Sequence, residues 1–486
     1  MRKRWLFLLL IGVLAVQSGC APAGDDSDAA YTNANVPTLT WVVPGEPQPD
    51  MPLVMAHVNT LIEPAIGVKL DLQFIDSASY EERLQMKLAS GETFDLCFVG
   101  YLYSYASAVG RSAVLPLADL IENNAPGLKD LIPEYAWQAA TIKNEIYCVP
   151  NVQMMASSSG LAIRQDLRDK YSLDTAGIQR LTDIEPFLRQ IRDNEAEVYP
   201  SDALIARDFA PNDKNYESFY AELIFLDAET ARILPYYEYP NIAEYAQTLH
   251  EWYDKGYLRK DIVTAGDAAG DRMAGRYATY TVFNKPGVAE EERRAKGYAV
   301  DVIPLNKPYM GSADPLATTT AISVTSRYPE AAIRLIEMVN RDEALYNAIC
   351  YGIEGKHYQK IAENRVEPLE TEGYSLPQSA WKFGNQFNAW LIPGQSDDVW
   401  ERTRKMNDEA VKSPILGLVL KQDNIKVELA QCIKIQLQYV VSVFNVGAED
   451  PRHYWAEYVN ALQEAGIDKI VADMQRQVNE FLAAAP

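Results

Sequence analysis

An alternation of strands and helices constrains the fold of this chain more than any other sequence feature. Residues 68–74 alternate apolar and polar side chains with a period of two, which is typical of a half-buried strand. A helix is expected next, because Ser79 and Glu82 have the spacing of a capping box. The largely apolar residues 94–99 suit a strand that is covered on both faces of a sheet. A strand, a helix and a strand at this spacing predict parallel strands joined by a right-handed crossover.

The same alternation continues along the chain, and the last third is predicted to be helical. Apolar residues repeat there at helical spacing until Gly447 interrupts them. A chain of 486 residues exceeds the length at which a single core usually divides, so two lobes are expected. Further strands are expected at residues 39–43, 277–283, 298–305 and 318–325, helices at 242–256 and 329–339, and a helical stripe at Ile425, Leu429, Ile433, Val440 and Phe444.

The amino terminus has the pattern of a secretory signal. Basic residues at positions 2–4 precede an apolar run that is too short to span a bilayer as a mature helix. Small residues then lead to Cys20, as in a bacterial lipobox, although Gln17 stands where that motif usually has leucine. We expect residues 1–19 to be a lipoprotein signal peptide and Cys20 to carry the lipid. The alternative is an ordinary cleaved signal in which Cys20 is incidental.

Residues 20–37 are predicted to be a flexible tether, because they offer almost no apolar surface to bury. The whole chain has 67 acidic and 45 basic residues, a net charge of −22. Such a field repels nucleic acid and anionic lipid headgroups. We therefore expect no nucleic-acid partner, a membrane contact through the lipid anchor only, and a monomer outside the cytoplasm.

The sequence carries none of the usual catalytic or metal-binding signatures. His250-Glu251 begins like a zinc helix, but Asp254 stands where the second histidine belongs. Neither a nucleophile elbow nor a glycine-rich phosphate loop is present. We expect no cofactor, no metal and no catalytic residues. A secreted carbohydrate-active hydrolase stays open as an alternative, because two carboxylates suffice for that chemistry and 67 acidic residues hide them. Four cysteines are expected to be buried thiols, since their spacing suits neither a metal site nor a disulfide framework: Cys97, Cys148, Cys350 and Cys432.

Several short motifs, in their order along the chain, resemble the extracellular solute-binding proteins of family 1, the maltose-binding-protein group. They include a helix-to-strand junction, a crossing between lobes, a helix end and a helix start: residues 90–96, 147–150, 251–257 and 326–340. A narrower branch of lipoproteins, whose C-terminal part is known only as a domain of unknown function, is similar at residues 351–358, 383–386 and 413–417.

The resemblance implies an α/β chain with the two-lobed type 2 periplasmic-binding fold, mixed sheets flanked by helices and a helical C-terminal region. Its expected role is the substrate-binding lipoprotein of an ABC importer, with permease subunits as partners and an extracellular oligosaccharide as ligand. A peptide-binding receptor of the same fold is a further alternative. The expected lobes are residues 38–150 with 307–326, and residues 151–306 with 327–486. Crossings between them are expected near residues 149–153, 303–307 and 326–328.

Ligands of open α/β sheets lie at the carboxyl ends of the strands, which directs attention to residues just after the predicted strands. Sugars combine C–H faces with hydroxyl groups, so aromatic rings, amides and carboxylates are the side chains sought there. Tyr101, Tyr103 and Tyr105 follow the strand at residues 94–99, and their period-two spacing would align them along an extended segment. The alternative is a helix start that buries one or two of them. Three further candidates come from loop or hinge position: Glu46, Asn151 and Tyr280.

Trp381, Asn385 and Trp390 form the most sugar-like group in the sequence, two indoles with an amide between them. They lie in a segment rich in glycine and aromatic residues. A packing patch between the lobes explains them equally well, because a buried indole with a satisfied N–H serves either purpose. Trp41 is expected in the core, as it alternates with apolar strand residues.

Overall fold

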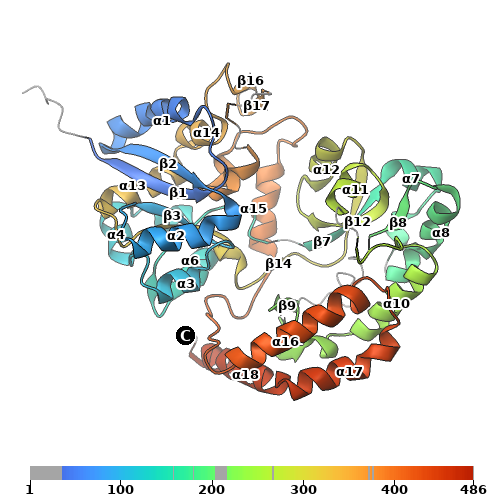
Figure 1. The fold of residues 1–486 in the computed structure, drawn as a ribbon. Helices are drawn as coiled ribbons and strands as arrows, with labels where there is room; N and C mark the ends of the chain where they lie inside the picture. Colours follow the sequence, from blue (N-terminus) through green and yellow to red (C-terminus); the bar gives the residue numbers. More distant parts are fainter. Residues whose placement is uncertain are drawn as a thin grey trace, which may run out of the picture.

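The computed structural model describes residues 36–156, 158–178, 180–202, 216–264, 268–369, 373–374 and 377–484. The predicted signal peptide, the lipidation site Cys20 and most of the predicted tether lie outside these residues. The described chain folds into three packed bodies, each with its own sheet (Figure 1). No helix among the described residues is long and apolar enough to cross a membrane.

The first body is built on a five-stranded sheet in the order β2-β1-β3-β15-β6. β1 pairs in parallel with both β2 and β3, which confirms the parallel arrangement predicted from the sequence. β15 returns antiparallel between β3 and β6. β1 begins at the outer edge of the body and runs toward the middle of the molecule (Figure 1). The strands are β1 (Thr38–Pro44), β2 (Lys69–Ile75), β3 (Leu96–Gly100), β6 (Val149–Pro150) and β15 (Thr318–Ile322).

Helices cover this sheet and share one core with it. The predicted helix around residue 330 begins with Pro329 in its first turn, as expected. The expected capping box does not form, because a short 3₁₀ turn precedes α2 and Asp76, not Ser79, accepts the capping hydrogen bond. The helices are α1 (Met51–Ile66), α2 (Tyr80–Ala89), α3 (Tyr105–Gly110), α4 (Ala118–Asn124), α5 (Leu128–Leu131), α6 (Glu134–Ala140), α13 (Pro329–Arg341), α14 (Glu343–Tyr351) and α15 (Val399–Glu409). Small hairpins add β4 (Thr141–Ile142) with β5 (Glu145–Ile146), and β16 (Tyr358–Ala362) with β17 (Arg365–Pro368).

The second body holds a four-stranded sheet in the order β13-β7-β12-β8, with helices on both faces. The strands predicted at residues 277–283 and 298–305 are confirmed as β12 and β13. Its elements are β7 (Ser158–Arg164), β8 (Tyr199–Ser201), β12 (Tyr277–Asn284), β13 (Val300–Pro304), α7 (Gln165–Lys170), α8 (Glu185–Asn194), α11 (Ala268–Met273) and α12 (Val288–Lys296).

The third body packs the C-terminal helices against a three-stranded antiparallel sheet. The predicted helical stripe is confirmed, since Ile425, Leu429, Val440 and Phe444 are all buried in this core. α10 joins the second and third bodies, because Tyr245 and Leu249 enter one core while Ile242 enters the other. The elements are β9 (Tyr216–Phe219), β10 (Ile224–Asp227), β11 (Ile233–Pro235), α10 (Ile242–Asp254), α16 (Lys426–Tyr439), α17 (Pro451–Glu464) and α18 (Ile467–Ala484).

Three chain segments connect the first body with the other two. The first follows β6, and the second lies between β13 and β15, as the sequence indicated. The third differs from the prediction: it lies between Ala410, in the first core, and Ile415, in the third, not near residues 326–328. The described residues between 329 and 410 therefore pack with the first body, whereas the sequence assigned this stretch to the C-terminal lobe. The apolar faces of α13 and α14 explain this packing, because they lie on the first sheet.

A short parallel ribbon links two of these segments. β14 (Tyr309–Met310) pairs with β18 (Val411–Lys412). Glu217 of β9 reaches this ribbon, and its carboxylate accepts hydrogen bonds from the backbone N–H of Ser312 at 2.8 Å and from the hydroxyl of Ser413 at 2.6 Å. A single buried carboxylate of the third body thus holds both connecting segments.

Candidate functional site

Three aromatic rings lie together where β1 and β3 end, and we call Phe98, Tyr101 and Trp381 the aromatic platform. The ring centroids of Tyr101 and Trp381 are 5.8 Å apart, and each of these rings packs edge-to-face with Phe98, at centroid distances of 5.8 Å and 6.5 Å. Phe98 is buried, Trp381 is half-buried, and Tyr101 keeps 57% of its surface exposed. Phe98 lies in β3, and Tyr101 follows the last residue of that strand. Trp381 lies in a 3₁₀ helix far along the chain, η6 (Pro377–Lys382). An exposed ring backed by buried rings is a suitable surface for the C–H face of a ligand.

Lys382 fixes η6 to the end of β1. Its ammonium group donates to the carbonyl oxygen of Pro44 at 2.8 Å and lies 5.3 Å from the ring of Trp381. Burial lowers the pKa of Lys382 below its usual value, because the charged amine loses most of its water. Burial also raises the pKa of Tyr101, so its hydroxyl stays neutral at physiological pH and keeps both donor and acceptor capacity.

Both predicted amides make hydrogen bonds within the segment that carries Trp381 or to it. Asn151 is buried; its amide donates to the carbonyl oxygen of Lys382 at 2.8 Å, and its oxygen accepts from the Thr320 hydroxyl at 3.2 Å. Asn385 caps a short 3₁₀ turn by accepting from the backbone N–H of Phe387 at 3.0 Å. Both therefore hold the segment that carries Trp381, which makes them positioning residues.

Glu46 follows β1 on the same edge of the sheet. Its side chain is exposed, and within the described part of the chain its carboxylate has no hydrogen-bond or ion-pair partner. The structure thus places Glu46 and Tyr101 just past the ends of two neighbouring strands, as the sequence predicted, and Trp381 packs against Tyr101.

Three predicted tyrosines are core residues, and this corrects the expected site. Tyr103 is fully buried, and the hydroxyl of Tyr105 donates to the carbonyl oxygen of Ala140 at 2.6 Å. The chain bends over residues 101–103 and α3 begins at Tyr105, so the expected extended segment with three aligned rings does not form and the alternative of a helix start that buries two of them holds. Tyr280 is buried in the second sheet, where its hydroxyl donates to Glu292 at 2.7 Å.

Trp390 lies apart from the platform. Its indole N–H donates to Glu343 at 2.7 Å, and its ring stacks on Tyr351 with centroids 6.3 Å apart. Lys360 covers the ring at 4.9 Å. Trp390 therefore belongs to a packed cluster between α14 and β16 within the first body, which is a packing role but not the predicted patch between the lobes. Trp41 is buried, as expected.

One exposed aromatic residue escaped the sequence analysis. Phe283, at the end of β12 in the second body, is 72% exposed. It pairs with Ser159 directly beside the first connecting segment, so it lies at the end of the second sheet that adjoins the first body. The signal was present in the sequence, because a large apolar residue ends a predicted strand just before Asn284-Lys285-Pro286. Its exposure could not be read from the strand pattern alone.

Metal and thiol chemistry find no support at the site. Within the described ranges, no group of three or more His, Cys, Asp or Glu side chains is placed to hold a metal ion. The four cysteines of the body are free and buried, as predicted, and burial raises the pKa of each thiol.

Similarity to known proteins runs along almost the whole chain. Residues 414–483 match the family model named Domain of unknown function (DUF3502). A protein of Streptococcus pneumoniae serotype 4 described as a carbohydrate ABC transporter substrate-binding protein is 27% identical, over 97% of this chain and 96% of its own length.

The fold matches crystal structures of NgtS, an N-glycan transport solute-binding protein from Streptococcus pneumoniae. One structure, whose description names no ligand, has 26% identity and a TM-score of 0.83, covering 92% of this chain and 99% of NgtS. The complex with Man1GlcNAc matches with 26% identity and a TM-score of 0.72, over 92% and 100% of the two chains, and the complex with Man5GlcNAc with 25% and 0.68, over 93% and 99%. The predicted resemblance to solute-binding proteins is thus confirmed, together with the two-lobed periplasmic-binding fold and the C-terminal domain of unknown function.

Proposed function

We propose that this chain is the substrate-binding component of an ABC importer and captures an extracellular oligosaccharide. The observation that carries the proposal is the exposed ring of Tyr101, packed against Trp381 at the carboxyl ends of β1 and β3. In an open α/β sheet this edge is where ligands bind. The similarity to NgtS, whose complexes contain mannose-bearing glycans, supports a saccharide as the ligand class.

The ligand would contact both lobes. Tyr101 and Trp381 provide a ring face on the first body, with the carboxylate of Glu46 as an acceptor for hydroxyl groups. Phe283 provides an exposed ring on the second body. A ligand that contacts both bodies binds the closed arrangement more tightly than the open one, and it therefore shifts the equilibrium toward closure.

The lobes that close are proposed as follows. The N-terminal lobe comprises residues 38–150, 307–326 and, from the packing of α13 to α15, residues 327–410. The C-terminal lobe comprises residues 151–306 and 411–486, because α10 joins the second and third bodies. The lower TM-scores of the NgtS complexes, 0.72 and 0.68 against 0.83, fit a fold whose lobes change their relative orientation.

We also propose that the protein is a monomeric lipoprotein with its lipid on Cys20, held outside the cytoplasmic membrane beside its permease subunits. Metabolic labelling with an alkyne-bearing fatty acid tests the anchor: the full chain should be labelled, and a Cys20→Ser variant should not. Label retained on the variant would refute lipidation at Cys20. Release of the chain as an ordinary secreted protein would support the incidental-cysteine alternative.

Isothermal titration with a panel of oligosaccharides tests the function. We expect saturable binding of at least one glycan with one site per chain, and recovery of the glycan chemically unchanged after release. Products that accumulate during incubation would support the hydrolase alternative instead. Binding of peptides without any glycan would support the peptide receptor.

A Tyr101→Ala variant should lose most of the glycan affinity and keep its melting temperature, because the ring is mostly exposed. Tyr328→Ala is the matched control, since Tyr328 is 41% exposed but lies at the start of α13, outside the proposed site. Equal affinities of the two variants would contradict the assigned platform.

A further inference from the structure

A polar side chain on the first connecting segment lies beside the aromatic platform. The side-chain amide of Gln153 donates to the hydroxyl of Thr318 at 2.7 Å. Thr318 begins β15 and pairs with Gly100, the last residue of β3, so it lies at the same edge of the sheet as Tyr101. The backbone N–H of Tyr101 donates to the carbonyl oxygen of Ala317 at 3.0 Å. The two neighbours Ala317 and Thr318 thus connect Gln153 with Tyr101.

Strand register places Thr318 on the face of the sheet that carries the platform. Phe98 of the platform pairs with Thr320, and residues directly opposite each other in a sheet point to the same face. Thr318 is two residues from Thr320 in the same strand, so its side chain points to that face as well. The Gln153–Thr318 pair and the platform therefore share one face and one edge of the first sheet.

Asn407 of α15 holds the backbone at Gln153 against the first body. The amide group of this buried residue donates to the carbonyl oxygen of Gln153 at 2.7 Å. Its oxygen accepts from the backbone N–H groups of Met155 and Ala156 at 2.9 Å and 3.0 Å. A side chain that is already fixed before a ligand arrives loses less conformational freedom on binding. Asn407 and Thr318 are therefore positioning residues for the amide of Gln153.

The amide of Gln153 keeps unused hydrogen-bonding capacity. Among the described residues its side-chain oxygen accepts no hydrogen bond, and an amide oxygen has two lone pairs. Gln153 is half-buried and thus partly accessible where the connecting segment passes between the bodies. A neutral acceptor beside aromatic rings suits a sugar, because the rings pack on its C–H face while the amide oxygen accepts from a hydroxyl group.

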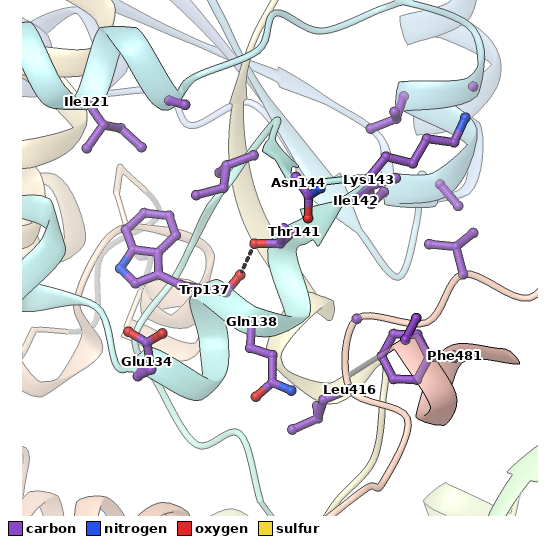
Figure 2. A pocket seen from close by; sticks show the side chains of 18 of the residues that line it. Ile121, Glu134, Trp137, Gln138, Thr141, Ile142, Lys143, Asn144, Leu416 and Phe481 are labelled. Carbon is purple, nitrogen blue, oxygen red and sulfur yellow. Dashed lines mark hydrogen bonds between the residues drawn. The ribbon is translucent and has the colours of Figure 1, made fainter. Parts of the chain in front are cut away.

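A separate pocket of about 1280 Å³ lies between the first body and the C-terminal region. Figure 2 shows Trp137 of the first body on its wall, with Leu416 and Phe481 contributed by the C-terminal region. Its lining holds three acidic and three basic side chains, and it includes neither a platform ring nor the Gln153–Thr318 pair. These mixed charges favour no single class of ligand, so hydroxyl recognition is assigned to the edge of the first sheet instead.

We propose that Gln153 is a specificity-determining residue of the oligosaccharide site, whose side-chain oxygen accepts a hydrogen bond from one hydroxyl group of the pyranose ring that packs on the platform. The inference rests on the proposed function and adds to it a defined polar contact on the first body. Epimeric sugars differ in the direction of their hydroxyl groups, so a fixed acceptor beside the rings selects among them. A sugar without the matching hydroxyl leaves the amide oxygen unpaired, which lowers its affinity.

Titration calorimetry with Man1GlcNAc and with analogues that each lack one hydroxyl group tests the contact. If this disaccharide does not bind, the tightest-binding glycan of the panel and its analogues replace it. The wild-type protein should bind one analogue about tenfold more weakly than the parent glycan, because one hydrogen bond is lost. The Gln153→Leu variant should bind the parent about tenfold more weakly and that analogue within about twofold of the parent, since the partner of the hydroxyl is gone. A merely structural role of Gln153 would weaken all these sugars by one factor and keep the difference between them.

Three further variants complete the test. Gln153→Glu keeps an oxygen acceptor and should keep the preference for the parent glycan. Gln165→Leu is the matched control, because Gln165 is also half-buried and donates to a side-chain oxygen, that of Asp301 at 2.9 Å, at the end of β7 away from the connecting segment. It should bind every sugar as the wild type does. If Gln153→Leu does not fold, Thr318→Val replaces it; loss of the hydroxyl that holds the amide should reduce the preference to about threefold.

The outcomes separate the inference from the proposed function. A wild-type protein that binds every analogue as tightly as the parent, or a Gln153→Leu variant that keeps the full difference between them, would overturn the role of Gln153 and leave the transport function standing. An unchanged preference in Thr318→Val, where that variant replaces Gln153→Leu, would do the same. A wild-type protein that binds no glycan of the panel would overturn both.

Discussion

The segments around Trp381 and Trp390 are close in sequence, yet the structure gives their indoles different surroundings. Trp390 donates its N–H to Glu343, stacks on Tyr351 and is covered by Lys360. Trp381 meets the exposed ring of Tyr101 at the end of a strand instead. The side chains that cover an indole ring decide whether it serves packing or binding. A sequence pattern does not show which side chains these are.

The largest expected effect is on the packed member of this pair. Trp390→Ala removes a half-buried indole, its hydrogen bond and its stacking contact, so the free energy of unfolding should fall by about 3 kcal/mol. Glycan affinity should stay within about twofold. Chemical denaturation and calorimetry check both values. A variant that unfolds like the wild type but no longer binds glycan would reverse the assignment of the two indoles.

Trp381→Ala should have the opposite profile. We expect glycan affinity to fall by about 30-fold, or about 2 kcal/mol, because a central aromatic anchor is lost. The free energy of unfolding should fall less than in Trp390→Ala, since the neighbouring Tyr101 is already exposed. Trp381→Phe is the control, as it keeps a ring and should recover part of the affinity. Undiminished binding by Trp381→Ala would remove the platform from the proposed site.

Phe283→Ala extends the comparison to the second body. Its ring is more exposed than that of Tyr101, so the melting temperature should not change. Glycan affinity should fall by about fivefold, or about 1 kcal/mol, if the ligand contacts both lobes. Small-angle scattering should then show less closure of the variant at the same glycan concentration. An unchanged affinity would leave the first body alone as the binding surface.

The smallest expected effect is on the pH dependence of stability, through Asp50 and away from the aromatic platform. The hydrogen bond with His357, and next that with Lys356, hold the pKa of Asp50 below its usual value. The pKa of this acid is lowered by folding, so its stabilising contribution is present above the unfolded value, near pH 4, and is lost as the pH falls through the folded pKa. The melting temperature of Asp50→Asn should therefore respond less to acid than that of the wild type. Glycan binding at neutral pH should be the same in both proteins.

Much of the fold follows from the sequence, because apolar periodicity specifies which residues are buried. The period-two run at residues 68–74 and the apolar run at 94–99 became parallel strands, and the C-terminal stripe became the third core. The packing of α13 and α14 could not be predicted from the sequence, because an apolar helix face does not show which surface it packs against. Their surfaces pack on the first sheet, which displaces the third crossing to residues 410–415.

The candidate site followed from the sequence only in part. Position after a strand identified Glu46 and Tyr101, and composition identified Trp381. Tyr103 and Tyr105 were misplaced because the chain bends over residues 101–103 and then begins α3 at Tyr105.

The carboxylate of Glu217 has a mechanical consequence for any motion of the lobes. It accepts hydrogen bonds from Ser312, which follows β14, and from Ser413, which follows β18, so both strands are tied to the third body. Any rotation of the third body against the first would then bend the chain where these strands meet the first sheet and α15.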